Sequence, residues 1–169
     1  MADSFELIVT RKEPVVVSPA SETPKGLHYL SNLDQNIAII VKTVYYFKSN
    51  LRSNEESYQV IKKSLSEVLV HYYPAAGRLT ISPEGKIAVD CTAEGVVVVE
   101  AEANCGIEMI KKAITEIDRP ETLEKLVYDV PDARSILEIP PVVVQNIRYQ
   151  REREENAEKV CYSYSLSTK

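Results

Sequence analysis

The sequence predicts a soluble α+β domain in which helices flank a mixed β-sheet. Its 169 residues are 44% hydrophobic and 27% charged, a composition typical of a globular domain large enough to bury a core. Short runs of β-branched and aromatic residues alternate with Pro- and Gly-containing turns, which is typical of strands. One longer segment repeats its apolar residues with a helical period instead.

Three strands are predicted within the first 47 residues. Residues 5–10 alternate apolar and polar side chains, and the strand resumes at 15–17 after Pro14. A loop follows over 18–26. Residues 36–47 are rich in β-branched and aromatic side chains, so we expect a strand that is buried on both faces.

An amphipathic helix is predicted over residues 53–72. Ser53 and Glu56 are spaced as a capping box, and Pro74 ends the helix because it cannot donate a backbone hydrogen bond. A single apolar stripe recurs along the segment at Ile61, Leu65, Val68, Leu69 and Tyr72. We expect the tyrosine pairs Tyr45–Tyr46 and Tyr72–Tyr73 to pack the sheet against this helix.

The second half predicts further strands and short helices. A β-hairpin is expected over 79–91, with its turn at 82–85, followed by an interior strand at 96–99. The remaining expectations are a helix at 105–117, short helical turns within 118–139, a strand at 142–147 and a loosely ordered, mixed-charge end.

Charge and composition exclude several classes of function. The net charge of −5 argues against a general nucleic-acid binder, and no apolar run is long enough for a transmembrane helix. The N-terminus lacks the pattern of a signal peptide, so we expect a cytoplasmic protein. The three cysteines form no CxxC pair, so we expect reduced thiols, no metal site and no cofactor.

The residues alone name no reaction. The sequence contains none of the motifs GxGxxG, Walker A, HExxH or GxSxG. Its two histidines, His28 and His71, stand in no nucleophile or metal motif, and we expect both to be structural.

Four stretches in order resemble the N-terminal part of the plant BAHD acyltransferases, which use acyl-CoA donors. They are LSNLDQ at 30–35, KSLSEVL at 63–69 continuing into YYPAAGRL at 72–79, GVVVVEA at 95–101, and PPVVVQ at 140–145. The phrases GLHYLSNLDQNIA and VHYYPAAGRLTIS are most similar to the hydroxycinnamoyl and feruloyl transferases that act on ω-hydroxy fatty acids, such as ω-hydroxypalmitate, and on fatty alcohols. The resemblance ends at Gln145.

This resemblance implies a chloramphenicol-acetyltransferase-like fold in two domains, with acyl-CoA and the hydroxyl acceptor meeting in a channel between them. The family's general base is the His of an HxxxD motif, and a later DFGWG motif supports the second domain. We therefore expect residues 1–145 to be an incomplete N-terminal acyltransferase domain and residues 146–169 to be a divergent charged tail.

The sequence departs from the family where catalysis is concerned. Neither His28 nor His71 has an Asp four residues later, and without Trp no DFGWG motif can occur. We expect this chain to be inactive alone and to associate with itself through exposed apolar surface. The alternatives are a non-catalytic binding or regulatory fragment, or a gene-model artefact.

The resemblance also assigns roles to individual residues. Asn36, Ile40 and Thr43 fall in the segment that contributes to the acceptor side of the channel in the family. No residue of this chain is assigned as catalytic. Structural roles are implied for the motif residues Leu30, Ser31, Leu33, Asp34, Gln35, Tyr73, Pro74, Gly77 and Arg78.

Overall fold

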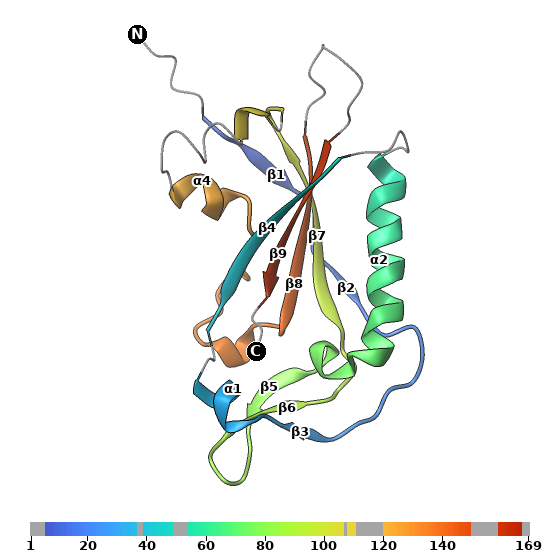
Figure 1. Cartoon of the computed structure of the whole chain (residues 1–169), viewed down its shortest axis with the longest axis vertical. Helices are drawn as coiled ribbons and strands as arrows, with labels where there is room; N and C mark the ends of the chain where they lie inside the picture. The colour runs from blue at the N-terminus through green and yellow to red at the C-terminus, as the bar shows by residue number, and fades with distance from the viewer. Residues whose placement is uncertain are drawn as a thin grey trace.

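Two β-sheets and one long helix organise the chain (Figure 1). The computed structural model describes residues 6–36, 39–48, 54–106, 108–110, 120–149 and 159–166. The strands are β1 (Val9–Arg11), β2 (Val15–Val17), β3 (Leu27–Tyr29), β4 (Val41–Lys48), β5 (Arg78–Ile81), β6 (Ile87–Asp90), β7 (Val96–Ala103), β8 (Val142–Arg148) and β9 (Lys159–Leu166). The helices are α1 (Asn32–Asn36), α2 (Asn54–His71) and α4 (Pro120–Lys125), with 3-10 turns η1 (Tyr73–Ala76) and η2 (Ile136–Glu138).

The large sheet is mixed, as expected. Its strands lie in the order β1-β7-β8-β9-β4, and β2 pairs with the same edge of β7 as β1 does. Only β7 and β8 run parallel among the described pairs, with Val97 opposite Val143. The parallel pair requires a long crossover between its strands, and residues 104–141 supply that connection.

The helix α2 covers one face of the large sheet (Figure 1). Tyr58 and Leu69 on α2 pack against Val96 and Val98 of β7 and Val144 of β8. The prediction of a helix is confirmed over residues 54–71, while Ser53, its expected cap, lies outside the described residues. Because the apolar side chains repeat with a period of 3.6 residues, they lie on one face of the helix, and this face packs on the sheet.

The opposite face of the sheet carries a second core. Ile110 and Leu126 pack there against Ala101 of β7 and Ile147 of β8. Alternate residues of β7 therefore enter different cores, which explains why the run Val96–Val99 shows no polar alternation.

Strand β4 corrects one expectation. The strand predicted at 36–47 begins only at Val41, because residues 32–36 form α1. It is also not buried on both faces, since β4 is the outer strand of the sheet and Val41 and Tyr45 are exposed. β-branched and aromatic residues favour a strand, but they do not decide whether it is central or at an edge.

Several smaller expectations are also corrected. The first strand occupies 9–11 rather than 5–10. Tyr45 and Tyr72 are exposed rather than packed between sheet and helix, whereas Tyr73 packs on the small sheet β3-β6-β5. Of the helix expected at 105–117, residues 108–110 are helical, and 107 and 111–119 lie outside the described residues.

The loosely ordered end is the largest correction. Residues 159–166 form β9, which lies inside the sheet between β8 and β4 and pairs antiparallel with both. The boundary expected at residue 145 falls within β8, which continues to Arg148. Residues 150–158 and 167–169 lie outside the described residues. A terminus without apolar anchors is expected to fray, yet the backbone of residues 159–166 pairs on both sides.

Candidate functional site

A cavity of about 580 Å³ opens beside the segment that follows α4. It is the candidate site in the part of the chain that the structure describes. Its lining combines aliphatic, aromatic and charged side chains from β1, α4 and the following loop: Arg11, Glu124, Lys125, Val127, Tyr128, Asp129 and Pro131. A mixed lining of this kind suits a ligand with both apolar and polar parts.

The wall of the cavity is fixed by Arg11 and Gln145. Arg11 donates from Nε to Oε1 of Gln145 at 2.7 Å and from Nη2 to the carbonyl oxygens of Lys125 and Val127 at 2.9 and 3.2 Å. Gln145 is fully buried on β8 and donates from Nε2 to the carbonyl oxygen of Leu126 at 2.9 Å. These bonds tie the loop after α4 to the central sheet.

Two further charged groups at the cavity, Lys125 and Asp129, are also engaged. Lys125 donates from Nζ to the carbonyl oxygen of Leu7 at 3.0 Å and lies 3.7 Å from Glu6. Asp129 forms a 2.8 Å ion pair with Lys42 of β4. No His or Cys occurs among the described lining residues.

The three residues expected to line an acceptor channel lie near the start of β4. Asn36 ends α1, Ile40 is exposed just before β4, and Thr43 is half-buried within it. None of them is among the described residues of the cavity, although Lys42, next to Thr43, reaches it through Asp129. Their role at a channel stays a prediction.

The LSNLDQ motif joins α1 to the small sheet. The hydroxyl of Ser31 accepts a bond from the Asp34 backbone N–H at 3.2 Å and donates to the Asp34 carboxylate at 2.8 Å, which caps the first turn. The Gln35 amide pairs with the backbone of Ile87, donating at 2.6 Å and accepting at 2.9 Å. Leu30 packs on the small sheet, whereas Leu33 is exposed.

The YYPAAGR motif turns the chain from α2 into β5. Pro74 occupies the first turn of η1, and the Gly77 N–H donates to its carbonyl oxygen at 3.0 Å. A Cβ atom on Gly77 would overlap the carbonyl oxygen of Asp90, so close backbone approach requires glycine there. Arg78 donates to the carbonyl oxygens of Gly77 and Gly95 at 2.7 and 2.9 Å and pairs with Glu94 at 3.1 Å.

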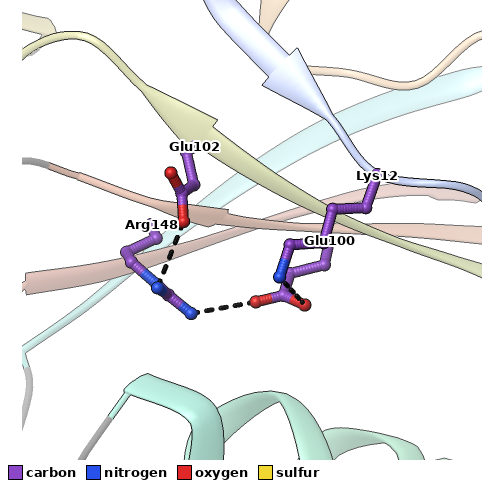
Figure 2. Close-up of polar contacts among 4 residues, drawn as sticks. All are labelled: Lys12, Glu100, Glu102 and Arg148. Carbon is purple, nitrogen blue, oxygen red and sulfur yellow. Dashed lines mark hydrogen bonds and ion pairs between the residues drawn. The ribbon is translucent and has the colours of Figure 1, made fainter.

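The α2-facing side of β7 carries an ion network that we did not predict (Figure 2). Glu100 accepts from Lys12 at 3.1 Å and from Arg148 at 2.9 Å, and Arg148 also reaches Glu102 at 3.1 Å. The sequence signal was the alternation of Glu100 and Glu102 at the end of an otherwise apolar strand. Its cations come from positions far away in the chain.

Two buried polar groups adjoin this network. Burial raises the pKa of the Tyr58 phenol above its ordinary value, and the negative charge of Glu100 raises it further. Lys62 lies 5.2 Å from the centre of the Tyr58 ring, a cation–π distance. Asn146, opposite Glu100 in the register, is buried, and its side-chain oxygen has no hydrogen-bond partner in the described structure.

The described residues contain no helix that is long and apolar enough to span a membrane. They also bring no three His, Cys, Asp or Glu side chains together as a metal site. His28 on β3 and His71 at the end of α2 are both exposed and lie outside the described cavity lining.

The comparisons with known proteins agree on one family. The model of the Transferase family matches residues 7–149, which is most of the chain. The chain belongs to this family. The resemblance to BAHD acyltransferases is therefore confirmed, and the match runs four residues past Gln145, where we expected it to end.

Two plant enzymes are similar to this chain in sequence. It is 93% identical over 145 residues to the fatty alcohol:caffeoyl-CoA acyltransferase of Arabidopsis thaliana, which covers 86% of this chain and 34% of that enzyme. It is 66% identical over 147 residues to the ω-hydroxypalmitate O-feruloyl transferase of the same plant, covering 87% of this chain and 32% of that enzyme. The chain thus spans about a third of the length of the curated relatives it matches.

The crystal structure of vinorine synthase has the same fold over nearly the whole chain. The TM-score is 0.73 at 24% identity, and the match covers 94% of this chain and 38% of that protein. This confirms the expected fold class.

Replacing Gln145 by alanine is expected to loosen the cavity wall. The change leaves Arg11 Nε and the Leu126 carbonyl without their buried partner. We expect a loss of about 2–3 kcal/mol in the free energy of unfolding, measured by urea denaturation. The control is Glu124→Ala at an exposed position of the same cavity, expected within about 0.5 kcal/mol of the parent. Equal stability of the two variants would contradict this account.

Tyr58 is expected to make stability fall at alkaline pH. Its raised pKa means that the unfolded chain loses the phenol proton first. Its contribution is therefore fully present below about pH 10 and is lost as the pH rises through the folded-state pKa. Denaturation curves measured from neutral to strongly alkaline pH should fall less steeply for Tyr58→Phe than for the parent. Parallel pH profiles would show that Tyr58 does not contribute.

Proposed function

We propose that this chain is the N-terminal unit of an acyltransferase that moves a caffeoyl or feruloyl group from CoA to the hydroxyl of a fatty alcohol or ω-hydroxy fatty acid. By itself the chain folds this unit but does not transfer the acyl group. The observation that carries the proposal is the 93% identity over 145 residues to the fatty alcohol:caffeoyl-CoA acyltransferase.

The gradient of identity among the relatives supports this substrate class. Two relatives whose names combine a hydroxycinnamoyl-type donor with a long-chain acceptor are 93% and 66% identical. The (Z)-3-hexen-1-ol acetyltransferase of the same plant, whose name gives a short acceptor and a small acyl group, is 38% identical. The benzyl alcohol O-benzoyltransferases of Nicotiana tabacum and Petunia hybrida, whose names give an aromatic acyl group and a short acceptor, are only 37% and 38% identical. The higher identities therefore belong to the two relatives that combine a hydroxycinnamoyl-type donor with a long-chain acceptor.

The start of β4 has the character that a long aliphatic acceptor needs. Ile40 and its neighbour Ile39 are both exposed, and Thr43 follows three residues later. We propose that Asn36, Ile40 and Thr43 face the acceptor in the complete enzyme, with the isoleucines contacting its hydrocarbon chain. Exposed apolar side chains of this kind gain from contact with methylene groups.

The proposed inactivity of this chain alone follows from proton transfer. A hydroxyl that attacks a thioester must lose its proton to a positioned base, and such a base supplies about 10²–10⁴-fold in rate. The sequence has no HxxxD, and both histidines are exposed outside the described cavity lining. Positioning of donor and acceptor by a second wall would be worth several kcal/mol more.

A second candidate function is a binding fragment without catalysis. The observation that favours it is the cavity beside α4, which is formed by residues of this chain and whose cations, Arg11 and Lys125, already bond to protein groups. Such a fragment would bind an amphipathic ligand without reacting with it.

A chimeric enzyme tests the proposal. Residues 1–145 of this chain replace the corresponding segment of the fatty alcohol:caffeoyl-CoA acyltransferase, and turnover of caffeoyl-CoA with a long-chain alcohol is measured. We expect kcat/KM within about tenfold of that enzyme. If residues 1–145 did not form their side of the substrate channel correctly, the loss in kcat/KM would be much larger, because donor and acceptor would no longer be positioned for reaction. The 169-residue chain alone should give background turnover.

Two variants of the chimera test the acceptor side. Ile40→Asp should raise KM for the alcohol more than KM for caffeoyl-CoA, because a charge replaces an apolar contact. Val60→Asp, at an exposed apolar position on α2, is the matched control and should leave both unchanged. A folded but inactive chimera would contradict the proposed function, as would turnover by the 169-residue chain alone.

A further inference from the structure

Arg11 is held in place by neutral oxygen atoms. Its Nε donates to Oε1 of Gln145 at 2.7 Å, and its Nη2 donates to two carbonyl oxygens, at the end of α4 and in the loop after it, at 2.9 and 3.2 Å. Arg78 and Arg148 each pair with a glutamate instead, whereas no carboxylate of the described residues forms an ion pair with Arg11. The positive charge of Arg11 is therefore not matched by an ion pair in this part of the chain.

The Nη1 donors of the same guanidinium remain available. The three bonds are made by Nε and Nη2, and no described residue accepts a hydrogen bond from Nη1. A guanidinium is planar, so bonds on one side of it also fix the direction of the donors on the other side. Arg11 is exposed where it lines the cavity, so a molecule in the cavity can reach this side chain.

The position of this guanidinium is set before any ligand binds. The backbone of Arg11 pairs with Ala101 of β7, and its partner Gln145 is fully buried on β8. The Gln145 amide also donates to the carbonyl oxygen of Leu126 at 2.9 Å, which fixes the oxygen that accepts from Arg11. A side chain that is already ordered loses little conformational freedom when it binds a ligand.

Apolar side chains lie in the same cavity as this guanidinium. Val127, Tyr128 and Pro131 are part of the lining, and the volume of about 580 Å³ is typical of sites for small molecules. The other charged groups of the described lining are one lysine and two carboxylates, Lys125, Glu124 and Asp129. An ordered cation beside apolar side chains suits a hydrocarbon chain that ends in a single negative charge.

The start of β4 adjoins the cavity on the same face of the large sheet. Val44 of β4 and Gln145 both lie opposite Ser163 in the register, so they share a face. Lys42, two residues before Val44, shares it as well and pairs with Asp129 of the lining at 2.8 Å. A ligand in the cavity can therefore continue toward the start of β4, which is proposed to face the acceptor.

We infer that this cavity binds the carboxylate of a long-chain carboxylic acid, which accepts hydrogen bonds from Nη1 of Arg11 while its hydrocarbon chain contacts the apolar part of the lining. Arginine and carboxylate form one of the stronger hydrogen-bonded pairs in proteins, because both groups are charged. The choice of acid rests on the proposed function, in which an ω-hydroxy fatty acid is one of the acceptors. Arg11 then recognises the end of this acceptor that does not react.

The phosphates of CoA are the other anions of the proposed reaction. The described lining holds two cations, Arg11 and Lys125, against the carboxylates of Glu124 and Asp129, and Lys125 also lies 3.7 Å from Glu6. Phosphate groups with several negative charges would meet nearly balanced charges there, whereas a carboxylate carries one charge and needs one guanidinium. The lining therefore favours a carboxylate, and CoA serves as a second ligand in the test.

Two ligands that differ only at one end test the inference in the 169-residue chain. ω-Hydroxydecanoate, a short and soluble ω-hydroxy acid, carries the carboxylate, and the α,ω-decanediol of the same length carries a hydroxyl in its place. The Kd values of both ligands and of CoA are measured by isothermal titration calorimetry for the parent chain, Arg11→Gln and Glu124→Gln. Circular dichroism checks that each variant folds.

We expect the parent chain to bind ω-hydroxydecanoate about tenfold more tightly than the diol, because hydrogen bonds between charged groups are stronger than those to neutral groups. Arg11→Gln should remove this preference and leave the Kd of the diol within about twofold, since the apolar lining is unchanged. Glu124→Gln, which removes an exposed negative charge from the same lining, should tighten binding of ω-hydroxydecanoate about two- to threefold.

Equal Kd values of the acid and the diol in the parent chain, or no measurable binding of the acid, would overturn the inference. A preference for the acid that survives Arg11→Gln would overturn it as well, and so would binding of CoA, but not of the acid, through Arg11. Should Arg11→Gln fail to fold, Glu124→Gln still decides, because weaker binding of the acid by that variant contradicts a carboxylate in this cavity. None of these outcomes depends on turnover by the chimera, so failure of this inference is distinguishable from failure of the proposed function.

Discussion

The pairing of β9 with two strands at once is the constraint on which the large sheet depends. β4 and β8 do not pair with each other, and every described strand contact of β4 is with β9. Through β9, the segment proposed to face the acceptor is attached to the strands that carry both cores. A central strand satisfies its backbone groups on both sides, so its loss would leave two rows of donors and acceptors unpaired.

The same sheet holds the polar groups that shape the candidate site. β8 presents Gln145 toward the loop after α4 and Arg148 toward the Glu100 network, because successive residues of a strand face opposite sides. Two consecutive residues at the end of β1 are divided in the same way: Arg11 bonds to Gln145 at the cavity, and Lys12 pairs with Glu100 in the ion network. The cavity and the ion network are thus opposite faces of one set of strands, and both depend on the register of β7 with β8.

The sequence predicts the local elements well and their arrangement less well. The helix at 54–71 was predictable because its apolar residues repeat with a helical period, and four motif stretches were enough to identify the family. The edge position of β4 was not predictable, because a strand's neighbours are set by long-range pairing. The Arg11–Gln145 contact spans 134 residues and leaves no local signal. For β9 a signal existed, since Tyr162, Tyr164 and Leu166 alternate with serines.

Hydrogen exchange in a proline variant of β9 tests the central claim most directly. Ser163 lies opposite both Val44 and Gln145, so Ser163→Pro removes a backbone donor within the strand and opposes its geometry. In the full chain, this variant should lose protection of the β4 amides, while the amides of β5 and β6 in the small sheet stay protected. Ser163→Ala, which keeps the backbone donor, should retain protection in both sheets. If the β4 amides of Ser163→Pro exchanged as slowly as those of Ser163→Ala, β9 would not be the strand that holds β4 in the sheet.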